Sequence, residues 1–98
     1  MINSTNLHSV YAYPVKLTAS KSVTANGTVD ITTELTNLGV DVDAVIGGFC
    51  ATTANLAITI TSNSANKKVY VANGGGSAAT ITVNDILMIL IAQNYYEN

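Results

Sequence analysis

The run Ile86–Ile91 constrains the fold of this chain more than any other segment. All six of its residues are apolar (Ile-Leu-Met-Ile-Leu-Ile), whereas a strand that covers a core on one side alternates apolar and polar residues. The two faces of the predicted strand are therefore both apolar. We expect one face, with Leu87, Ile89 and Ile91, to lie in a core. The other, with Ile86, Met88 and Leu90, also needs a cover.

The composition favours strands over helices. Charged residues make up 10% of the 98 residues and apolar residues 48%, against roughly 25% charged in ordinary soluble domains. Lys, Glu, Gln and Arg, which suit helix surfaces, are scarce, while Thr, Val and Ile, which suit pleated strands, are plentiful. The length fits one domain, residues 1–98, of which the polar segment 1–9 is expected to be loose.

Strand-like segments recur along the chain with turn residues between them. This spacing predicts an all-β fold: a single antiparallel β-sandwich, jelly-roll-like, of roughly six to eight short strands. The segment that contains Pro14 should be an edge strand or the beginning of a strand, since proline donates no ladder hydrogen bond. Gly47-Gly48 predicts a bulge or a close backbone approach. The expected strands are 11–17, 22–24, 28–31, 44–51, 56–61, 68–72 and 78–91, the last interrupted at Asn84-Asp85.

The turn geometry of two short segments can be predicted more closely. Between 22–24 and 28–31, a three-residue hairpin loop would set Val23 opposite Val29 and place Gly27 in the left-handed region; a corner between two sheets is the alternative. Residues 34–37 could form one helical turn that closes at Gly39.

Residue types that carry chemistry are few. His8 is the only histidine and Cys50 the only cysteine, so no intrachain disulfide forms, and we expect Cys50 to be a small buried residue. Asp41 and Asp43 would share one face if that segment were a strand, but a solvated loop is the simpler interpretation. Neither the calcium-loop spacing nor the helix that must follow a phosphate-binding loop is present. We predict no catalytic residue, no cofactor and no metal.

Charge and hydropathy also limit the partners. The net charge is −2, with four Lys and no Arg, which argues against nucleic acid. The apolar run at 86–92 is too short for a membrane helix, and the first residues do not have the pattern of a signal peptide. Synthesis in a cytoplasm without membrane insertion is expected.

The five tyrosines could stack on sugars, although packing or interface roles explain them as well.

Two kinds of surface could bind a partner. The second apolar face of the last strand can be buried by another segment of the chain or by a second copy of the chain. Only residues 34–43 are available as a covering segment. We therefore predict a homo-oligomer interface formed by Ile86, Met88 and Leu90. Exposed loops on a rigid sandwich commonly carry recognition. The candidate recognition residues are Thr52, Thr53, Asn55, Asn73, Gly74, Gly75, Gly76 and Ser77.

The order of several segments resembles a known family. Leu38-Gly39, the apolar strand 44–47, Ile58-Thr59-Ile60, Val69-Tyr70-Val71-Ala72-Asn73 and the final apolar strand follow one another as in the small β-sandwich domains at the ends of bacteriophage tail-fibre, baseplate and head-fibre proteins. The chain departs from that pattern at Val40, where an aromatic residue is common, and at Met88, where a tyrosine is common.

The resemblance implies a function that composition alone does not. It suggests a non-enzymatic virion component, made in the bacterial host and commonly trimeric, which decorates the particle or contacts other virion proteins or a host glycan. A carbohydrate-binding module acting at a cell surface is the alternative. No binding residue carries over from the family.

Overall fold

Eight strands and one short helix follow each other in the described part of the chain. The computed structural model describes residues 7–52, 57–63 and 65–95. The strands are β1 (Leu7–Val15), β2 (Lys21–Val23), β3 (Thr28–Asp30), β4 (Val45–Cys50), β5 (Ile58–Asn63), β6 (Lys68–Asn73), β7 (Ala79–Ile81) and β8 (Leu87–Tyr95). The helix α1 spans Thr32–Asn37, and a 3-10 turn, η1, spans Val42–Ala44. The predicted all-β sandwich is confirmed.

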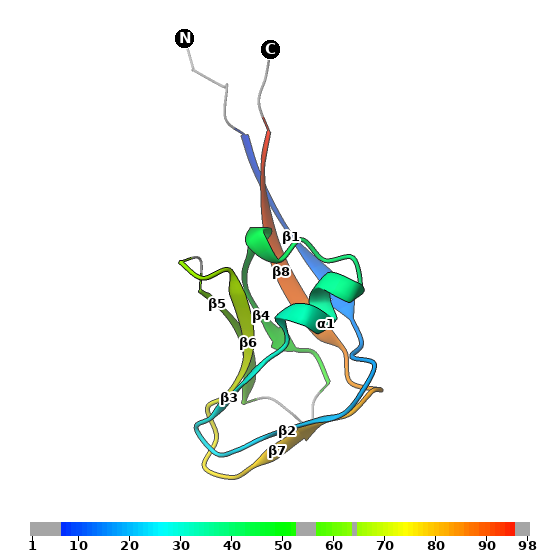
Figure 1. Ribbon diagram of the computed structural model, residues 1–98, viewed down its shortest axis with the longest axis vertical. Helices are drawn as coiled ribbons and strands as arrows, with labels where there is room; N and C mark the ends of the chain where they lie inside the picture. Colours follow the sequence, from blue (N-terminus) through cyan, green and yellow to red (C-terminus); the bar gives the residue numbers. More distant parts are fainter. Residues whose placement is uncertain (1–6, 53–56, 64, 96–98) are drawn as a thin grey trace.

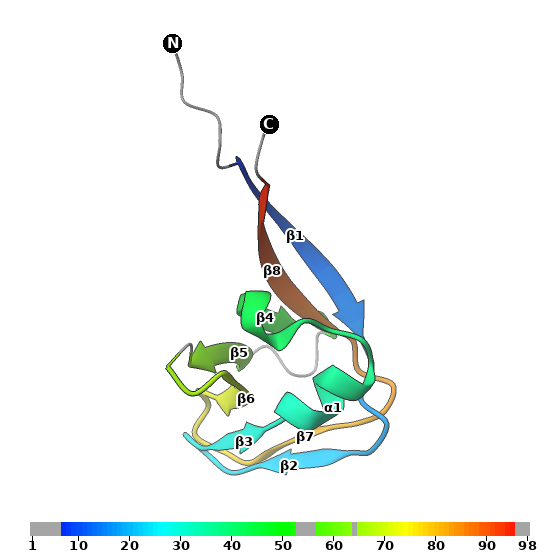
Figure 2. The same cartoon turned by 45° about the horizontal axis from the view of Figure 1, so that its top comes forward.

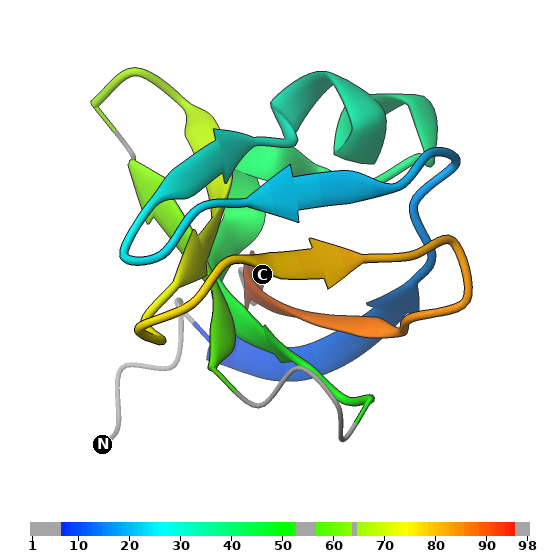
Figure 3. The ribbon, with the colours of Figure 1, turned by 90° about the horizontal axis from the view of Figure 1, so that it is seen from below.

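The strands form two antiparallel sheets. The larger has the order β1-β8-β4-β5-β6-β3 and the smaller pairs β2 with β7. The pairings β4–β5, β3–β6, β2–β7 and β1–β8 enclose one another along the sequence, which is the nesting of a jelly roll. Seen from below, β2 and β7 lie side by side across one end of the sandwich, with α1 beside them (Figure 3).

The core lies between the large sheet, the small sheet and α1. β8 and β6 contribute alternate residues to it, and Val23, Ile31, Leu35 and Ile81 close it from the small sheet and the helix. Leu87 and Ile89 are fully buried and Ile91 nearly so, which confirms the predicted core face of the last strand. Cys50 is buried, as predicted.

The helical turn and the bulge were predicted correctly. α1 starts two residues earlier than the expected turn and closes at Gly39, whose φ of 87° lies in the left-handed region that favours glycine. In β4 the register with β8 shifts between Val45 and Gly47. A Cβ on Gly48 would contact the carbonyl oxygen of Met88 and lie 2.9 Å from Ile60 Cγ1. This glycine therefore permits β4 and β8 to approach each other.

The hairpin prediction for residues 22–31 was wrong, and the alternative, a corner between sheets, is correct. Val23 pairs with Ala79 in the small sheet and Val29 with Val71 in the large one. Asn26, with a φ of 57°, takes the left-handed position that was expected at Gly27. Short strands such as these pair with distant partners because burial of Val23 and Ile31 in the common core outweighs a local turn.

Two strand boundaries also differ from the sequence predictions. β1 begins at Leu7, inside the segment that was expected to be loose, because β8 pairs with it throughout its length. β7 and β8 are separate strands in different sheets, whereas one interrupted strand was expected over 78–91; Val83, which lies between them, is 42% exposed. The intervening turn is closed by Asp85, which is buried and whose Oδ2 accepts from the backbone N–H of Thr82 at 2.8 Å.

β1 and β8 extend beyond the rest of the sandwich. β4 pairs with β8 from Val45 opposite Ile91 onward, so beyond Ile91 the described part of β8 has β1 as its only neighbour. Figures 1 and 2 show these two strands projecting together from the body of the molecule. β1 is also an edge of the sheet, as Pro14 predicted.

Candidate functional site

One side of the large sheet carries apolar residues that the described part of the chain does not cover. Paired residues in neighbouring strands point to the same side, so the register defines this surface. Met88 lies between Pro14 and Phe49, and Leu90 between Ala12 and Gly47. We call it the outer apolar face; its members are Val10, Ala12, Pro14, Met88, Leu90, Ala92, Phe49 and, at the bulge, Ile46.

The outer apolar face is strongly exposed. Val10 is 59%, Ile46 54% and Phe49 45% accessible, while Met88 and Leu90 are half-buried by their neighbours. β1, β4 and β8 contain no Lys, Arg, Asp or Glu. Long edge strands in monomeric proteins are usually protected by charges, prolines or bulges, and here Pro14 is the only such residue in β1. This surface has the composition of a contact surface.

The three predicted interface residues lie on or next to this face. Met88 and Leu90 are outer residues of β8, as the two-sided periodicity indicated. Ile86 directly precedes the strand and is 37% exposed; its carbonyl accepts from Ala51 N–H at 2.8 Å and its N–H donates to Thr52 Oγ1 at 3.0 Å. The sequence did not identify Val10, Ile46 and Phe49, which come from strands whose neighbours could not be predicted.

The predicted recognition loops differ from one another. Thr52 is half-buried and its hydroxyl holds the backbone of Ile86; Thr53 and Asn55 lie outside the described residues. In the second loop, Gly74, Gly76 and Ser77 are exposed, Gly75 is half-buried, and Asn73 is buried at 2% exposure.

Asn73 organises the second loop. Its Nδ2 donates to the carbonyls of Val23 (3.1 Å), Thr24 (3.3 Å) and Ser77 (2.8 Å). Its Oδ1 accepts from Gly75 N–H at 2.9 Å. A Cβ on Gly75 would lie 3.2 Å from that same Oδ1. Asn73 is therefore a structural residue, and Gly75 is a poor position for testing recognition because a substitution there would also disturb this network.

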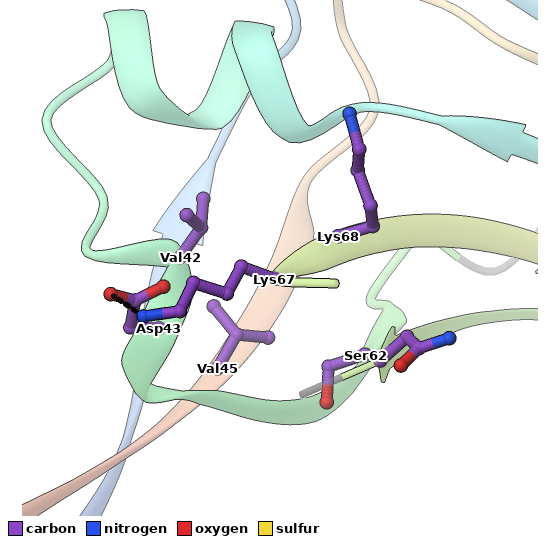
Figure 4. A pocket seen from close by; sticks show the side chains of 7 residues that line it. Val42, Asp43, Val45, Ser62, Lys67 and Lys68 are labelled. Atoms are coloured by element: carbon purple, nitrogen blue, oxygen red, sulfur yellow. Dashed lines mark hydrogen bonds and ion pairs between the residues drawn. The ribbon is translucent and has the colours of Figure 1, made fainter. Parts of the chain in front are cut away.

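A small pocket lies where η1 meets the β5–β6 turn (Figure 4). Its volume is about 120 Å³, and Val42 and Val45 form its apolar wall. Lys67 Nζ lies 3.5 Å from Asp43 Oδ2, and both side chains are more than half exposed. Such surface pairs contribute little to stability. Because the carboxylate neutralises the lysine, the pocket does not have the character of an anion site.

Lys68 points away from that pair in Figure 4. Its Nζ lies 3.7 Å from Asp30 Oδ2. Hydrogen bonds to the side chain and the backbone of Thr32 lower the pKa of Asp30, and Lys68 adds to the effect. The two lysines thus serve separate acidic partners and form no common cationic patch.

A groove of about 240 Å³ lies on the other side of β1, opposite the outer apolar face. It is lined by Tyr11, Tyr13, Gly39, Val40, Asp41 and Ile91. The two tyrosines pair with Ile91 and Ile89, so they point to the core side of the sheet. They are nevertheless 43% and 42% exposed, because the sandwich ends at this point.

The residues considered for catalysis or metal binding do not come together. The Cys50 thiol is buried and lies 3.9 Å from the carbonyl of Thr52. Asp41 and Asp43 lie at the start of η1 rather than on a strand, with Asp41 Oδ1 accepting from Asp43 N–H at 3.1 Å. Within residues 7–52, 57–63 and 65–95, no three metal-ligating side chains are grouped, and no helix is long and apolar enough to span a membrane.

Comparisons with protein-family models, with curated proteins and with solved structures found no match to this chain.

Proposed function

We propose that this chain is a non-enzymatic structural or adhesion module that assembles with copies of itself through the outer apolar face. The observation that carries the proposal is the exposure of Val10, Ile46 and Phe49 around the half-buried Met88 and Leu90. Fully burying a side chain of this kind contributes roughly 1.5–3 kcal/mol. A shared contact between chains would remove this surface from water.

The projecting strands support self-assembly independently. A two-stranded ribbon is marginally stable by itself in water. Beyond Ile91 the described part of β8 pairs with β1 alone. Neighbouring copies that cover the outer apolar face along β1 and β8 would stabilise the ribbon, and a trimer around an axis parallel to these strands would do so for every chain.

The setting we propose is a bacteriophage particle, in a fibre, a baseplate or a head decoration. The order of segments from Leu38 to the last strand supports this setting. Locating the chain on purified virions by mass spectrometry or immunogold labelling would test it, and absence from particles would remove this part of the proposal while leaving self-assembly intact.

Sedimentation velocity tests the assembly directly. The unaltered chain should sediment as an oligomer at micromolar concentration. Met88→Lys should shift it to monomer while the far-ultraviolet circular dichroism stays β-rich, because a lysine there would be buried unpaired in the contact. Thr33→Lys, at an exposed position of α1, is the matched control and should leave the oligomer unchanged.

Two results would contradict the assembly proposal. One is a clean monomer for the unaltered chain across the micromolar range. The other is an oligomer that withstands Met88→Lys and also Phe49→Lys, which changes the same face from β4.

A carbohydrate-binding module remains the second candidate. The specific observation in its favour is the pair of exposed tyrosines on β1, since aromatic rings with a polar tip are suited to sugars.

A further inference from the structure

The groove beneath β1 has a lining that suits a particular kind of ligand. Tyr11 and Tyr13 are two residues apart in one strand, so both rings stand on the same side of the sheet, roughly 7 Å from each other along β1. Opposite them, the chain passes from α1 to η1 through Gly39, Val40 and Asp41. Two aromatic rings thus face a short loop that contains one carboxylate.

The polar groups of the groove are available. Asp41 is exposed, and of its two carboxylate oxygens only Oδ1 is used within the described residues, by Asp43 N–H. A Cβ added to Gly39 would meet nothing within 4 Å, so the loop leaves open space at this glycine. Ile91 and Val40 are both buried and form the apolar floor.

The charges exclude an anionic ligand. No Lys, Arg or His is among the described residues that line the groove, and the chain carries a net charge of −2. A neutral ligand that has apolar patches for the rings and hydroxyl donors for the carboxylate fits this lining. Those are the features of a sugar ring, whose C–H faces pack on aromatic rings while its hydroxyls donate to carboxylates.

We propose that the groove formed by Tyr11, Tyr13 and Asp41 binds a neutral saccharide. Tyr11 and Tyr13 would pack against the ring faces, and Asp41 Oδ2 would accept from one or two hydroxyls. The volume of about 240 Å³ is below the ~300 Å³ at which typical small-molecule pockets begin. The groove therefore accommodates one sugar unit of a longer chain and holds it weakly, because it offers less contact than a typical small-molecule pocket.

The proposal does not depend on self-assembly, because the groove and the outer apolar face are on opposite sides of β1. If both hold, one oligomer presents several weak sites at once, and binding to a polymeric glycan is strengthened by multivalency. Loss of the oligomer would then weaken binding to a polymer but leave binding to a short oligosaccharide unchanged.

Amide chemical shifts in solution test the groove. The probes are neutral oligosaccharides of glucose, galactose, mannose and N-acetylglucosamine, each titrated to about 10 mM so that weak binding is detected. At least one should shift the amides of Tyr11, Tyr13 and residues 39–41 in a saturable way. Tyr11→Ala and Tyr13→Ala should each weaken binding by about two- to tenfold, since an aromatic contact contributes on this scale.

Two further variants make the test specific. Asp41→Asn removes the charge but keeps an oxygen for the turn, and should weaken binding severalfold. Tyr70→Ala removes a tyrosine from β6, on the outer side of the sheet opposite Thr61, and should leave binding unchanged. All four variants should keep the oligomeric state of the unaltered chain.

Two outcomes would overturn the proposal. They are the absence of groove shifts with every probe, and binding that withstands both tyrosine changes. Each can be observed whether the protein is monomeric or oligomeric, so failure of the groove is distinguishable from failure of the assembly.

Discussion

β8 and β6 are both interior strands of the large sheet, yet they are held in different ways. β6 places Val69, Val71 and Asn73 in the interior and a mixed set of residues outside. Polar side chains fix its two ends: Thr32 Oγ1 accepts from Val69 N–H at 2.8 Å, and Asn73 makes the network described above. β8 is held by apolar contacts on its inner side and has an apolar outer side as well.

The difference divides the sheet into two halves. The half around β6 satisfies its polar groups and presents Thr, Asp and Lys to water, so it is complete within one chain. The half around β8 leaves apolar area exposed, and in the assembly proposed above a partner would cover it. On that proposal, one edge of the sheet belongs to the folded subunit and the other to the contact between chains.

The largest expected effect is a difference in the free energy of unfolding between substitutions on the inner and the outer side of β8. Ile89→Ala empties a fully buried position and should lower the free energy of unfolding by about 2–5 kcal/mol. Leu90→Ala, on the half-buried outer side, should cost the isolated subunit about 1 kcal/mol. Urea denaturation at a concentration low enough for monomer would measure both. Equal losses would show that β8 is not divided in this way.

The next largest effect on stability is expected at Asn73, whose side chain holds one end of β6 through hydrogen bonds. Asn73→Ala would leave the carbonyls of Val23 and Ser77 without their donor, and should cost about 2–3 kcal/mol. That corresponds to a fall in Tm of roughly 10 °C or more for a chain of this size. Asn66→Ala, at an exposed turn position, is the control and should stay within about 0.5 kcal/mol. A small effect at Asn73 would mean that β6 relies on apolar packing as β8 does.

Adjacent glycines in β4 provide a smaller and well-matched comparison. Gly47 and Gly48 have the same φ of 156°, so φ does not distinguish an alanine at one site from an alanine at the other. At Gly48 its Cβ would collide with the backbone of Met88, whereas at Gly47 the nearest atom is Ile60 O at 3.6 Å. Gly48→Ala should therefore be less stable than Gly47→Ala by about 1–2 kcal/mol in thermal melts. The reverse order of stabilities would show that the close approach of β4 to β8 does not occur at Gly48.

The smallest effect concerns the pH dependence at β3 and β6. The pKa of Asp30 is lowered from 3.8 in the folded chain, so this carboxylate stabilises the fold above that value. The contribution is lost as pH falls through the folded-state pKa, which lies below 3.8. Asp30→Asn should cost at most about 0.5 kcal/mol at neutral pH, because the side chain is 45% exposed. The difference from the unaltered chain should shrink as the pH falls below 3.8; a constant difference would point to a cause other than titration.

Local patterns in the sequence predicted what depends on local geometry. The alternation in β6, the two-sided β8, the turn closed at Gly39 and the bulge at Gly47-Gly48 follow from period, parity and backbone freedom. Strand partners did not follow, because Val23 and Val29 pair with residues far away in the sequence.

The sites were predicted less completely for the same reason. Tyr11 and Tyr13 were candidates for sugar contact, but the loop from Gly39 to Asp41 joins them only in three dimensions. Asn73 was interpreted as a loop residue, although it continues the inward parity of Val69 and Val71. Its position could have indicated its role, because a polar residue at an inward-facing position of a strand usually forms buried hydrogen bonds.

The nested pairing of the strands has a consequence for the order of folding. Closing a short loop costs less entropy than closing a long one. We therefore expect β4 and β5 to pair at low cost and β1–β8, which encloses the other nested pairs, to form last. The outer apolar face spans β1, β8 and β4, and so it is completed only with that final pairing. In the assembly proposed above, a subunit would therefore offer its contact surface only after β1 has paired with β8.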